Sequence, residues 1–482
     1  MVKKKFYVTT PIYYANSEPH IGSVYTTVAA DILARWHKLL GENVFFLTGT
    51  DEHGQKIQEI AQKNNLKPKE YVDKIANKFQ QVFKSLNISN DYFIRTTNKE
   101  HEKQVKEILQ DLYDKKLIYK GTYESYYCVG CEQYLNKNDL IDGKCVLHKK
   151  EPEIIKEGSY MFKLSNFQEE ILKSITSEKF NILPKKRRNE MLSFIKQGIN
   201  DIPISRLKSK VSWGIDLPFD KEHTCYVWVD AFWNYITGLV INKKLKEFWS
   251  PDIQLMANDI LRVHATIWPA LLISQKKELP KNMFIHGYFT VNGQKMSKSL
   301  GNVVNPDYLV EKYSTDTLRY FLFRNIPFGH DGDFSEKDLA ERHNNELANK
   351  LGNLVSRTTT LAEKYGIKKV KENKLLKKLK LKQIQEHFEN FEIDKSLTEI
   401  FAFVDLCNEY IQSKKPWETH DREVLYELID SIKSIAILLW PYIPSTSEKI
   451  SKNLGFDLKF SEIQKPLKNT KIKKSEILFK KI

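Results

Sequence analysis

The sequence contains no apolar run as long as the ~18 residues that a helix needs to cross a bilayer, which excludes a helical membrane protein. It also leaves no room for a signal or transit peptide, because Met1–Lys5 leads directly into an apolar strand pattern at Phe6–Thr10. No internal repeat is present. We therefore expect a cytoplasmic protein that does not bind a membrane.

Cysteine is scarce. Five cysteines, an odd number in a chain without a secretion signal, argue against a disulfide framework. The hydrophobic content of 41%, with 12% aromatic residues, is enough to build packed cores, which argues against wholesale disorder. Because 482 residues are too many for one core, the usual roughly 100 to 200 residues per domain predicts three or four domains.

Basic residues outnumber acidic ones, giving a formal charge of +15. Such a charge raises the local concentration of a polyanion such as RNA, in a manner that salt weakens. The same count also describes lysines spread over solvated faces. The charge by itself leaves both interpretations open.

Strand and helix patterns alternate over the first part of the chain. Phe6–Thr10 is predicted to be a buried strand, Ile21–Leu40 has the apolar spacing of a helix, and Val44–Leu47 repeats the strand pattern. Helical patterns then continue to about Lys116. Because this alternation is typical of a parallel α/β sheet with ligands at its carboxyl edge, we assign residues 1–116 to the first half of a Rossmann-type domain.

The pattern becomes irregular near Gly121 and stays mixed to about Thr224, so residues 117–224 are interpreted as an inserted domain. Strands are expected again in residues 225–286, the second half of the sheet. These expected strands are Tyr226–Asp230, Ile253–Met256 and Met283–Ile285.

The remaining chain has little strand character. Residues 287–334 are assigned to a loop and linking region, and residues 335–482 carry the amphipathic patterns of a helical bundle. The last stretch, residues 461–482, holds seven lysines and two glutamates. It is predicted to be a basic helix or a frayed tail.

Two segments have the composition of phosphate-binding elements. In Pro19–Ser23, between the first strand and its helix, Gly22 permits close backbone approach, the helix start offers free N–H donors, and His20 can donate to a phosphate oxygen. Far downstream, Lys295 and Lys298 lie in a loop bounded by Gly293 and Gly301, able to bring positive charge onto a triphosphate. Either segment alone is more often a turn or a solvated loop, but their order along the chain argues against coincidence.

Together the two segments resemble the His-Ile-Gly-His and Lys-Met-Ser-Lys-Ser signatures of class I aminoacyl-tRNA synthetases. The second is matched in full by Lys295–Ser299, whereas Ser23 stands in place of the second histidine of the first. Serine can donate a hydrogen bond but carries no charge, so catalysis is expected to survive at a lower rate. The resemblance implies ATP with Mg²⁺ and the catalytic residues His20, Gly22, Ser23, Lys295 and Lys298. It implies ATP contacts from His20, Gly22, Asp259, Lys295, Ser297 and Lys298.

The methionyl members of this class are the most similar, through the blocks at residues 10–16, 48–54, 226–231 and 259–264. The resemblance implies a methionine pocket of Ile12, Tyr14, Asp51, Trp228, Ala231, Tyr235, Ile260 and His264. Asp51 would pair with the substrate ammonium, and aromatic and apolar walls suit an unbranched thioether. Core packing is the alternative for each aromatic taken singly. Departures from the family pattern occur at Ala257, Asn258 and Val263.

Four metal-ligand side chains follow zinc spacing: Cys128, Cys131, Cys145 and His148. Two short turns with thirteen residues between them match a closed tetrahedral structural zinc site. A redox pair is the alternative for the first two cysteines, but the second half-site completes a coordination shell. Cys225 and Cys407 are interpreted as buried core thiols.

In the helical part, Asn353, Arg357 and Trp417 match by position the family's anticodon-reading residues. Single-stranded loops are read by stacking and by hydrogen bonds to base edges, which these side chains provide. A helix cap and a core tryptophan are the alternative. Because no further dimerising domain follows, a monomer is expected.

The resemblance therefore predicts a Rossmann-type parallel sheet split by a zinc-knuckle connective insertion and followed by an all-α anticodon-binding bundle. The expected reaction activates methionine with ATP and transfers it to tRNA(Met). A catalytically silent tRNA-binding paralogue and a class I synthetase for another amino acid are the alternatives. The insertion is too short to hold an editing domain as well as the knuckle, which argues against the leucine, isoleucine and valine enzymes.

Overall fold

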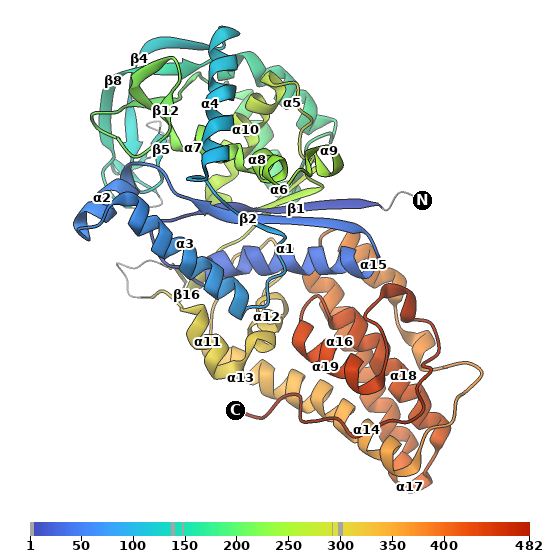
Figure 1. The fold of residues 1–482 in the computed structure, drawn as a ribbon. Coiled ribbons are helices and arrows are strands. Elements are labelled where there is room, and N and C mark those ends of the chain that lie inside the picture. The colour runs from blue at the N-terminus through green and yellow to red at the C-terminus, as the bar shows by residue number, and fades with distance from the viewer. Residues whose placement is uncertain (1–3, 136–139, 147–148, 292, 297–301) are drawn as a thin grey trace.

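The computed structural model describes residues 4–135, 140–146, 149–291, 293–296 and 302–482. Its centre is a six-stranded parallel sheet in the order β3-β2-β1-β14-β15-β9 (Figure 1). The inserted domain lies on one side of this sheet and the helical bundle on the other. The strands are β1 (Lys5–Tyr14), β2 (Asn43–Asp51), β3 (Tyr92–Arg95), β9 (Asn181–Leu183), β14 (Ile253–Ala257) and β15 (Asn282–His286).

The first strand and helix form where the sequence predicts them. Helix α1 (Ile21–Leu39) follows β1 and is buried along most of its length. It covers one face of the sheet, and its Trp36 ring stacks on Phe388 of the bundle with centroids 3.9 Å apart. Because the helix is enclosed between the sheet and the bundle, it buries polar residues such as Thr27, Asp31 and Arg35 as well as its apolar ones. The other helices of the first half are α2 (Gln55–Lys63), α3 (Pro68–Ser85) and α4 (Lys99–Asp114).

The region interpreted as an insertion is built around a four-stranded antiparallel sheet, β10-β8-β4-β5. It also contributes β9 to the central sheet, beside β15. Residues 181–183 therefore belong to the parallel sheet although they lie within the predicted insertion. The elements are β4 (Ile118–Cys128), β5 (Gln133–Leu135), β6 (Leu140–Ile141), β7 (Lys144–Cys145), β8 (Glu153–Phe162), α5 (Gln168–Thr176), α6 (Lys185–Lys196), β10 (Ile202–Pro203), β11 (Ser205–Leu207), β12 (Asp216–Leu217) and β13 (Asp220–Cys225).

The strand predicted at Tyr226–Asp230 is wrong. Tyr226 precedes a helix, α7 (Val227–Phe232), while the strand ends at Cys225. A short apolar run carries no period that separates a buried strand from a buried helix, and this helix is apolar because neighbours surround it. The two later strands, β14 and β15, are confirmed. Between α7 and β14 lie α8 (Asn234–Ile241) and α9 (Leu245–Phe248). Between β14 and β15 lie η3 (Asn258–Ile260) and α10 (Leu261–Ser274).

A small three-stranded sheet and two helices link the central sheet to the bundle. The linking elements are β16 (Phe289–Val291), β17 (Gln294–Lys295), β18 (Gly332–Asp333), α11 (Pro306–Tyr313) and α12 (Thr315–Arg324). The bundle is helical, as predicted. It contains α13 (Glu336–Arg342), the π-helical η5 (His343–Gly352), α14 (Asn353–Tyr365), α15 (Leu381–Glu389), α16 (Ile393–Lys414), α17 (Pro416–Thr419), α18 (Arg422–Leu439) and α19 (Pro444–Leu454).

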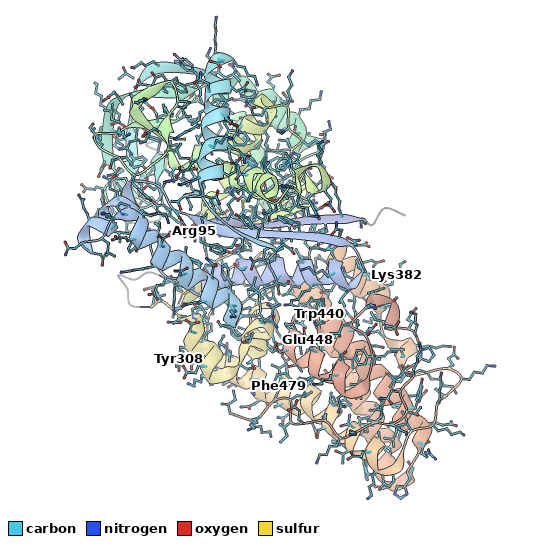
Figure 2. The ribbon with its side chains drawn as sticks, in the orientation of Figure 1. Arg95, Tyr308, Lys382, Trp440, Glu448 and Phe479 are labelled. Atoms are coloured by element: carbon cyan, nitrogen blue, oxygen red, sulfur yellow. The ribbon has the colours of Figure 1, made fainter. Side chains whose placement is uncertain are left out.

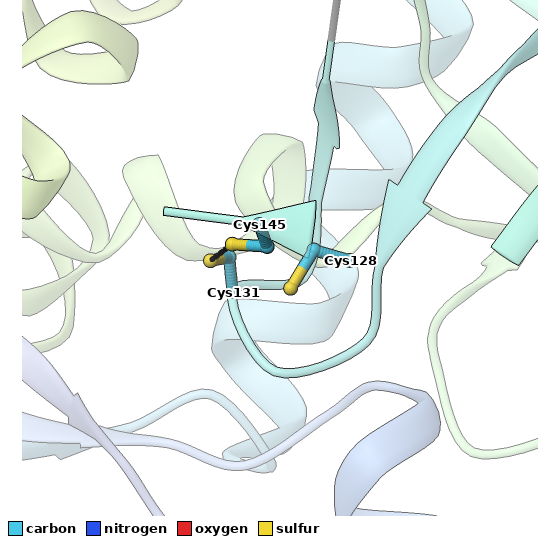
Figure 3. A group of neighbouring side chains, drawn as sticks. All are labelled: Cys128, Cys131 and Cys145. Atoms are coloured by element: carbon cyan, nitrogen blue, oxygen red, sulfur yellow. Dashed lines mark hydrogen bonds between the residues drawn. The ribbon is translucent and has the colours of Figure 1, made fainter. Parts of the chain in front are cut away.

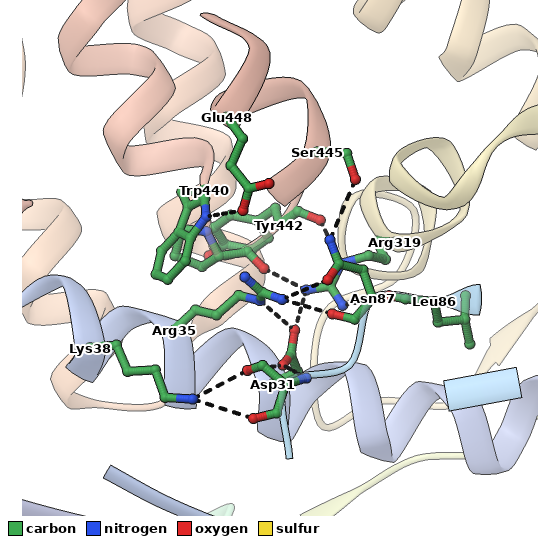
Figure 4. A network of polar contacts seen from close by, with 12 residues as sticks. Asp31, Arg35, Lys38, Leu86, Asn87, Arg319, Trp440, Tyr442, Ser445 and Glu448 are labelled. Carbon is green, nitrogen blue, oxygen red and sulfur yellow. Dashed lines mark hydrogen bonds and ion pairs between the residues drawn. The ribbon is translucent and has the colours of Figure 1, made fainter. Parts of the chain in front are cut away.

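A buried arginine joins the linking region, the central-sheet domain and the helical bundle (Figure 4). The Arg319 side chain in α12 is fully buried and pairs with Asp31 of α1 at 2.7 Å. Its guanidinium also donates to the carbonyls of Pro441 and Tyr442 in the bundle and of Leu86 after α3. The Arg319 guanidinium thus connects the bundle to α1, and its buried charge is matched by acceptors from several elements.

The C-terminal stretch is neither a helix nor a frayed tail. It crosses the bundle in irregular form and buries Ile463, Leu467 and Phe479, the last of which Figure 2 labels. His343 donates to the Lys480 carbonyl at 2.7 Å. The widely spaced apolar residues follow no helical period, so composition alone suggested a solvated segment. Within the described residues, no helix has both the length and the apolar content needed to span a membrane.

Candidate active site and metal centre

The carboxyl ends of β1 and β2 bring the first candidate residues together. In the parallel register, Tyr14 is opposite Asp51 and Ile12 is opposite Gly49. The ladder shifts between Thr9 and Ile12, which is the kind of irregularity that re-aims side chains next to a site. The structure thus places Tyr14 and Asp51 side by side at the edge where ligands of such sheets bind.

Asp51 carries an unsatisfied carboxylate oxygen. Its Oδ1 is buried and has no hydrogen-bond partner among the described residues. Burial raises the pKa of Asp51 well above its ordinary value, and the carboxylates of Asp230, Glu132 and Glu52 raise it further. The nearby His53 opposes this shift only in part, so the site can take a further cation. A substrate ammonium would supply that missing charge.

Two histidines that sequence reasoning left without a role meet at Asp230. His53 Nδ1 lies 2.7 Å from one Asp230 carboxylate oxygen, and His101 Nε2 lies 2.8 Å from the other. Burial opposes a charge on His53, but Asp230 outweighs it and raises the pKa of His53 to about 10. The protonated His53 therefore partly offsets the acidic residues around the site. The sequence block Thr48–Gly54 predicts a site at this strand end, but it does not indicate that His53 and His101 both lie beside Asp230.

The apolar part of the site comes from α7, α8 and α10. The His264 ring donates from Nδ1 to the Ile260 carbonyl at 2.9 Å, so its Nε2 must accept from the Tyr235 hydroxyl, also at 2.9 Å. Burial lowers the pKa of His264 to about 4, which keeps the ring neutral. The Trp228 ring meets His264 edge-on, with centroids 6.0 Å apart.

The predicted pocket residues are thus distributed over two groups. Trp228, Tyr235, Ile260 and His264 are connected as described, and Ala231 is buried on the same helix as Trp228. The other group is at the strand ends, where Tyr14 and Asp51 are neighbours and Ile12 packs with a small core. The indole N–H of Trp228 is buried with no hydrogen-bond partner in the described part of the chain, a second unsatisfied polar atom near the site.

His20 caps the start of α1. Its Nδ1 accepts from the Gly22 amide at 3.1 Å, while Ser23 Oγ accepts from the His20 amide at 3.1 Å and donates to the His20 carbonyl at 2.8 Å. The Ile21 amide donates to the Val304 carbonyl at 3.3 Å. The first two amides of the helix are therefore occupied here, in contrast to the free donors expected from the sequence.

Gly22 is required by this close packing. A methyl group at its Cα would lie 2.9 Å from Cε1 of His20 and 3.9 Å from Cε of Met296. The first contact is shorter than real side chains show, so a larger residue would push the imidazole away. The second brings the described part of the downstream signature beside the first one.

Two further predicted ATP-site residues lie in or directly after other strands. Lys295 lies in β17, paired with Thr290 of β16, and Asp259 lies in η3 directly after β14. Ser297 and Lys298 lie outside the described residues. The structure therefore brings the start of the second signature to the helix that carries the first.

Three cysteines meet in the knuckle (Figure 3). The Sγ atoms of Cys128, Cys131 and Cys145 all lie within 4.8 Å of one another, and those of Cys131 and Cys145 are 3.7 Å apart. Thiolates bound to one tetrahedral zinc at the usual Zn–S length are about 3.8 Å apart. The arrangement therefore fits a tetrahedral ion with three sulfur ligands. His148, the fourth predicted ligand, lies outside the described residues.

Arg357 and Trp417 meet on the bundle surface. The Arg357 guanidinium lies 5.1 Å from the centre of the Trp417 ring, joining α14 to the short helix α17. Asn353 is exposed one turn before Arg357, so both side chains project from the same face of α14. The π-helix η5 ends directly before Asn353, an irregularity often found at functional sites.

Comparison with protein-family models gives two matches. The model described as tRNA synthetases class I (M) matches residues 6–139 and 130–359. The model described as anticodon-binding domain of tRNA ligase matches residues 374–481. Together they cover the central sheet, the insertion and most of the bundle.

Individual relatives agree with these models. A methionine–tRNA ligase of Caldanaerobacter subterraneus subsp. tengcongensis is 43% identical, covering 100% of this chain and 79% of the relative. One from Thermotoga maritima is 40% identical over 99% of the chain and 80% of the relative. Methionyl-tRNA synthetase of Mycobacterium tuberculosis in complex with methionyl-adenylate has a TM-score of 0.94 at 32% identity, covering 99% of each chain. Its free form has a TM-score of 0.85 at 30% identity, over 100% of this chain and 98% of that one.

Proposed function

Because the chain belongs to the methionyl-tRNA synthetases of class I, we infer from that premise how its own residues carry out the reaction. The chain is a methionine–tRNA ligase. It activates methionine with ATP to methionyl-adenylate and pyrophosphate, and then transfers methionine to the 3′ end of tRNA(Met). The solved relative bound to methionyl-adenylate supports this reaction sequence.

Methionine is held between Asp51 and the apolar walls of α7, α8 and α10. The observation that carries this assignment is the buried Asp51 Oδ1, which no described residue satisfies and to which an ammonium can bind. The thioether would lie among Trp228, Tyr235 and His264, where sulfur makes favourable contacts with aromatic rings. Neutral His264 with a fixed tautomer presents no charge to an apolar side chain. Ile12, Tyr14, Ala231 and Ile260 complete the proposed pocket.

ATP lies across the start of α1 and the downstream signature. The methionine carboxylate attacks the α-phosphate in line and expels pyrophosphate, without a covalent enzyme intermediate. Catalysis then rests on positioning and on charges aimed at the transition state, from His20, Lys295 and Lys298. Magnesium enters with ATP as part of the substrate and neutralises charge on the leaving group. Gly22, Asp259 and Ser297 complete the proposed ATP contacts.

Ser23 is assigned a positioning role. Its hydroxyl both donates to and accepts from the backbone of His20, so it stabilises the cap that holds the imidazole. With serine in place of the second histidine, the protein offers less positive charge to the transition state, while the geometry of His20 is preserved. This supports a reaction that is slower and still functional.

The knuckle binds one structural zinc ion through Cys128, Cys131, Cys145 and His148. The sulfur spacing supports this set, and a zinc ion bound by four protein ligands would rigidify the turns that carry them. On the bundle, Asn353 and Arg357 contact anticodon bases and Trp417 stacks on one of them. We keep the domain division at residues 116, 224, 286 and 334 as part of this proposal, with β9 crossing back into the central sheet.

Charging of tRNA tests the proposal. The chain should form an alkali-labile methionyl ester on tRNA(Met) when given methionine, ATP and Mg²⁺, and none on a tRNA with another anticodon. Binding of tRNA without any ester formation would favour the silent tRNA-binding alternative. Ester formation with another amino acid would favour a different class I specificity.

A further inference from the structure

Glu132 links the metal knuckle to the proposed methionine pocket. The residue directly follows the predicted ligand Cys131 and is almost fully buried, with 4% exposure. Its Oε1 accepts from the Tyr14 hydroxyl at 2.8 Å and from the Lys56 amide at 2.9 Å. Its Oε2 accepts from the Tyr127 hydroxyl. The carboxylate therefore bridges Tyr14, the start of the helix at Lys56, and Tyr127.

The groups that Glu132 contacts belong to walls of the pocket. Tyr14 ends β1 beside Asp51. The Lys56 amide lies in the first turn of α2, whose N-cap Gly54 supplies no side-chain cap, so the Glu132 carboxylate caps this helix from a distant part of the chain. The Glu132 carbonyl accepts from the Tyr226 hydroxyl at 2.5 Å, just before the helix that carries Trp228.

The backbone at Gly54 is shaped to allow this contact. Its φ of +110° favours glycine, and a Cβ there would lie 2.8 Å from the Tyr14 hydroxyl and 2.9 Å from Oε1 of Glu132. Any side chain would therefore separate the two groups. The hydrogen bond between Tyr14 and Glu132 depends on the space that Gly54 leaves.

We propose that Glu132 is a positioning residue through which the metal-bound knuckle orders Tyr14 for methionine binding. A bound ion fixes the turn from Cys128 to Cys131, in which the Cys131 amide already donates to the Cys128 carbonyl at 3.1 Å. Glu132 is the next residue, so the position of its carboxylate follows that turn. Without the ion the carboxylate is less well held, and Tyr14 loses the acceptor that fixes its ring beside Asp51. This inference rests on the proposed methionine pocket.

The first test compares Glu132→Ala with Glu132→Gln in the zinc-loaded chain. Loss of a hydrogen bond to a charged group should weaken methionine binding about tenfold in Glu132→Ala, while the Kd for ATP changes less than about twofold. Glutamine keeps one acceptor for Tyr14, so Glu132→Gln should recover most of the loss. Titration calorimetry measures both constants, and metal release measures zinc content. Glu151→Ala, at an exposed position of the same insertion, is the matched control and should match the unaltered chain.

A double-mutant cycle separates this role from general support of the fold. Tyr14→Phe and Glu132→Ala should weaken methionine binding by similar factors and together by little more than either alone, because both remove the hydrogen bond between Tyr14 and Glu132. Additive effects would overturn the proposal. So would a methionine Kd within about twofold of normal in Glu132→Ala, or equal losses for methionine and ATP that glutamine does not restore.

Removal of the metal tests the coupling itself. Chelation should raise the methionine Kd of the unaltered chain about tenfold and that of Glu132→Ala by less than about twofold, since the connection is already broken. Equal effects on both proteins would overturn the coupling while leaving the methionine pocket intact. Absence of methionine binding by the unaltered, zinc-loaded chain would overturn the proposed function as well.

Discussion

Replacing Asp51 by asparagine should separate the stability of this protein from its activity. Asp51 is half-buried, its enclosed Oδ1 has no partner among the described residues, and Asp230, Glu132 and Glu52 add negative charge nearby. The amide side chain of Asp51→Asn would keep the size of the original and remove the charge. If the missing partner is the methionine ammonium, the substitution removes the interaction that matters to the substrate. In the free fold it removes the repulsion from the neighbouring carboxylates together with an attraction to His53 that offsets this repulsion only in part.

The magnitude follows from the kind of bond that is lost. A hydrogen bond to a charged group contributes about 1.5 to 3 kcal/mol, so kcat/KM for methionine should fall about 10- to 100-fold. The KM for ATP should change little. The free energy of unfolding should stay the same or rise, because burial and like charges already disfavour the ionised carboxyl.

The pH dependence provides a second check on the direction of the change in the free energy of unfolding. A carboxyl whose pKa is raised in the folded state makes the fold less stable as the pH rises above the ordinary aspartate range. The gain in stability of Asp51→Asn should therefore be present at neutral pH and disappear in acid. Chemical denaturation at several pH values measures this gain.

The neighbouring glutamate provides the contrasting control. Glu52 accepts hydrogen bonds from Thr50, Arg95 and Thr97, so Glu52→Gln should lower the Tm, the reverse of the Asp51 variant (Arg95 is labelled in Figure 2). Methionine-dependent pyrophosphate exchange measures activity in both. A KM for methionine within about twofold of normal in Asp51→Asn, or a clear drop in its Tm, would refute the reasoning.

Three other variants test separate parts of the molecule. Lys298→Ala should reduce methionine-dependent pyrophosphate exchange by about 100-fold or more and leave the Kd for tRNA nearly unchanged in filter binding, because its charge acts on the transition state; normal exchange would exclude that role. Trp417→Ala should raise the KM for tRNA about tenfold in charging assays without affecting exchange, because it removes one stacked base and the partner of Arg357; unchanged charging would exclude stacking. Because Asp230 raises the pKa of His53 from 6.5 to about 10, the stability it contributes is fully present below pH 6.5 and is lost as the pH rises toward 10. His53→Gln should flatten this loss in denaturation curves, and an unchanged slope would contradict the assigned charge.

Much of the fold could be predicted because local patterns agree with it. The strand at Phe6–Thr10 and the helix from Ile21 have clear periods, and the structure has β1 and α1 there. The short apolar run after Cys225 had no period, and its helical state is decided by packing against neighbours far along the chain. The three-residue strand β9 was equally invisible, because its place in the sheet depends on pairing with β15.

The candidate site, too, was predicted only where local sequence carries the information. Motifs identified Asp51 and His264 because family resemblance reports on single positions. The partners of His53 were missed because His53 and Asp230 are 177 positions apart and meet only in the folded chain. Glu132 was overlooked since it adjoins a cysteine that already had an explanation. The only hint in the sequence was an acidic residue within an otherwise apolar and metal-binding turn.

The most direct test of the assigned activity is amino-acid-dependent exchange of pyrophosphate into ATP, measured without tRNA on folded, zinc-loaded protein. Methionine, leucine, isoleucine, valine and cysteine should be compared at equal concentration. We predict exchange with methionine alone, in spite of Ser23. Exchange with none of them would contradict the assignment and favour a silent tRNA-binding protein.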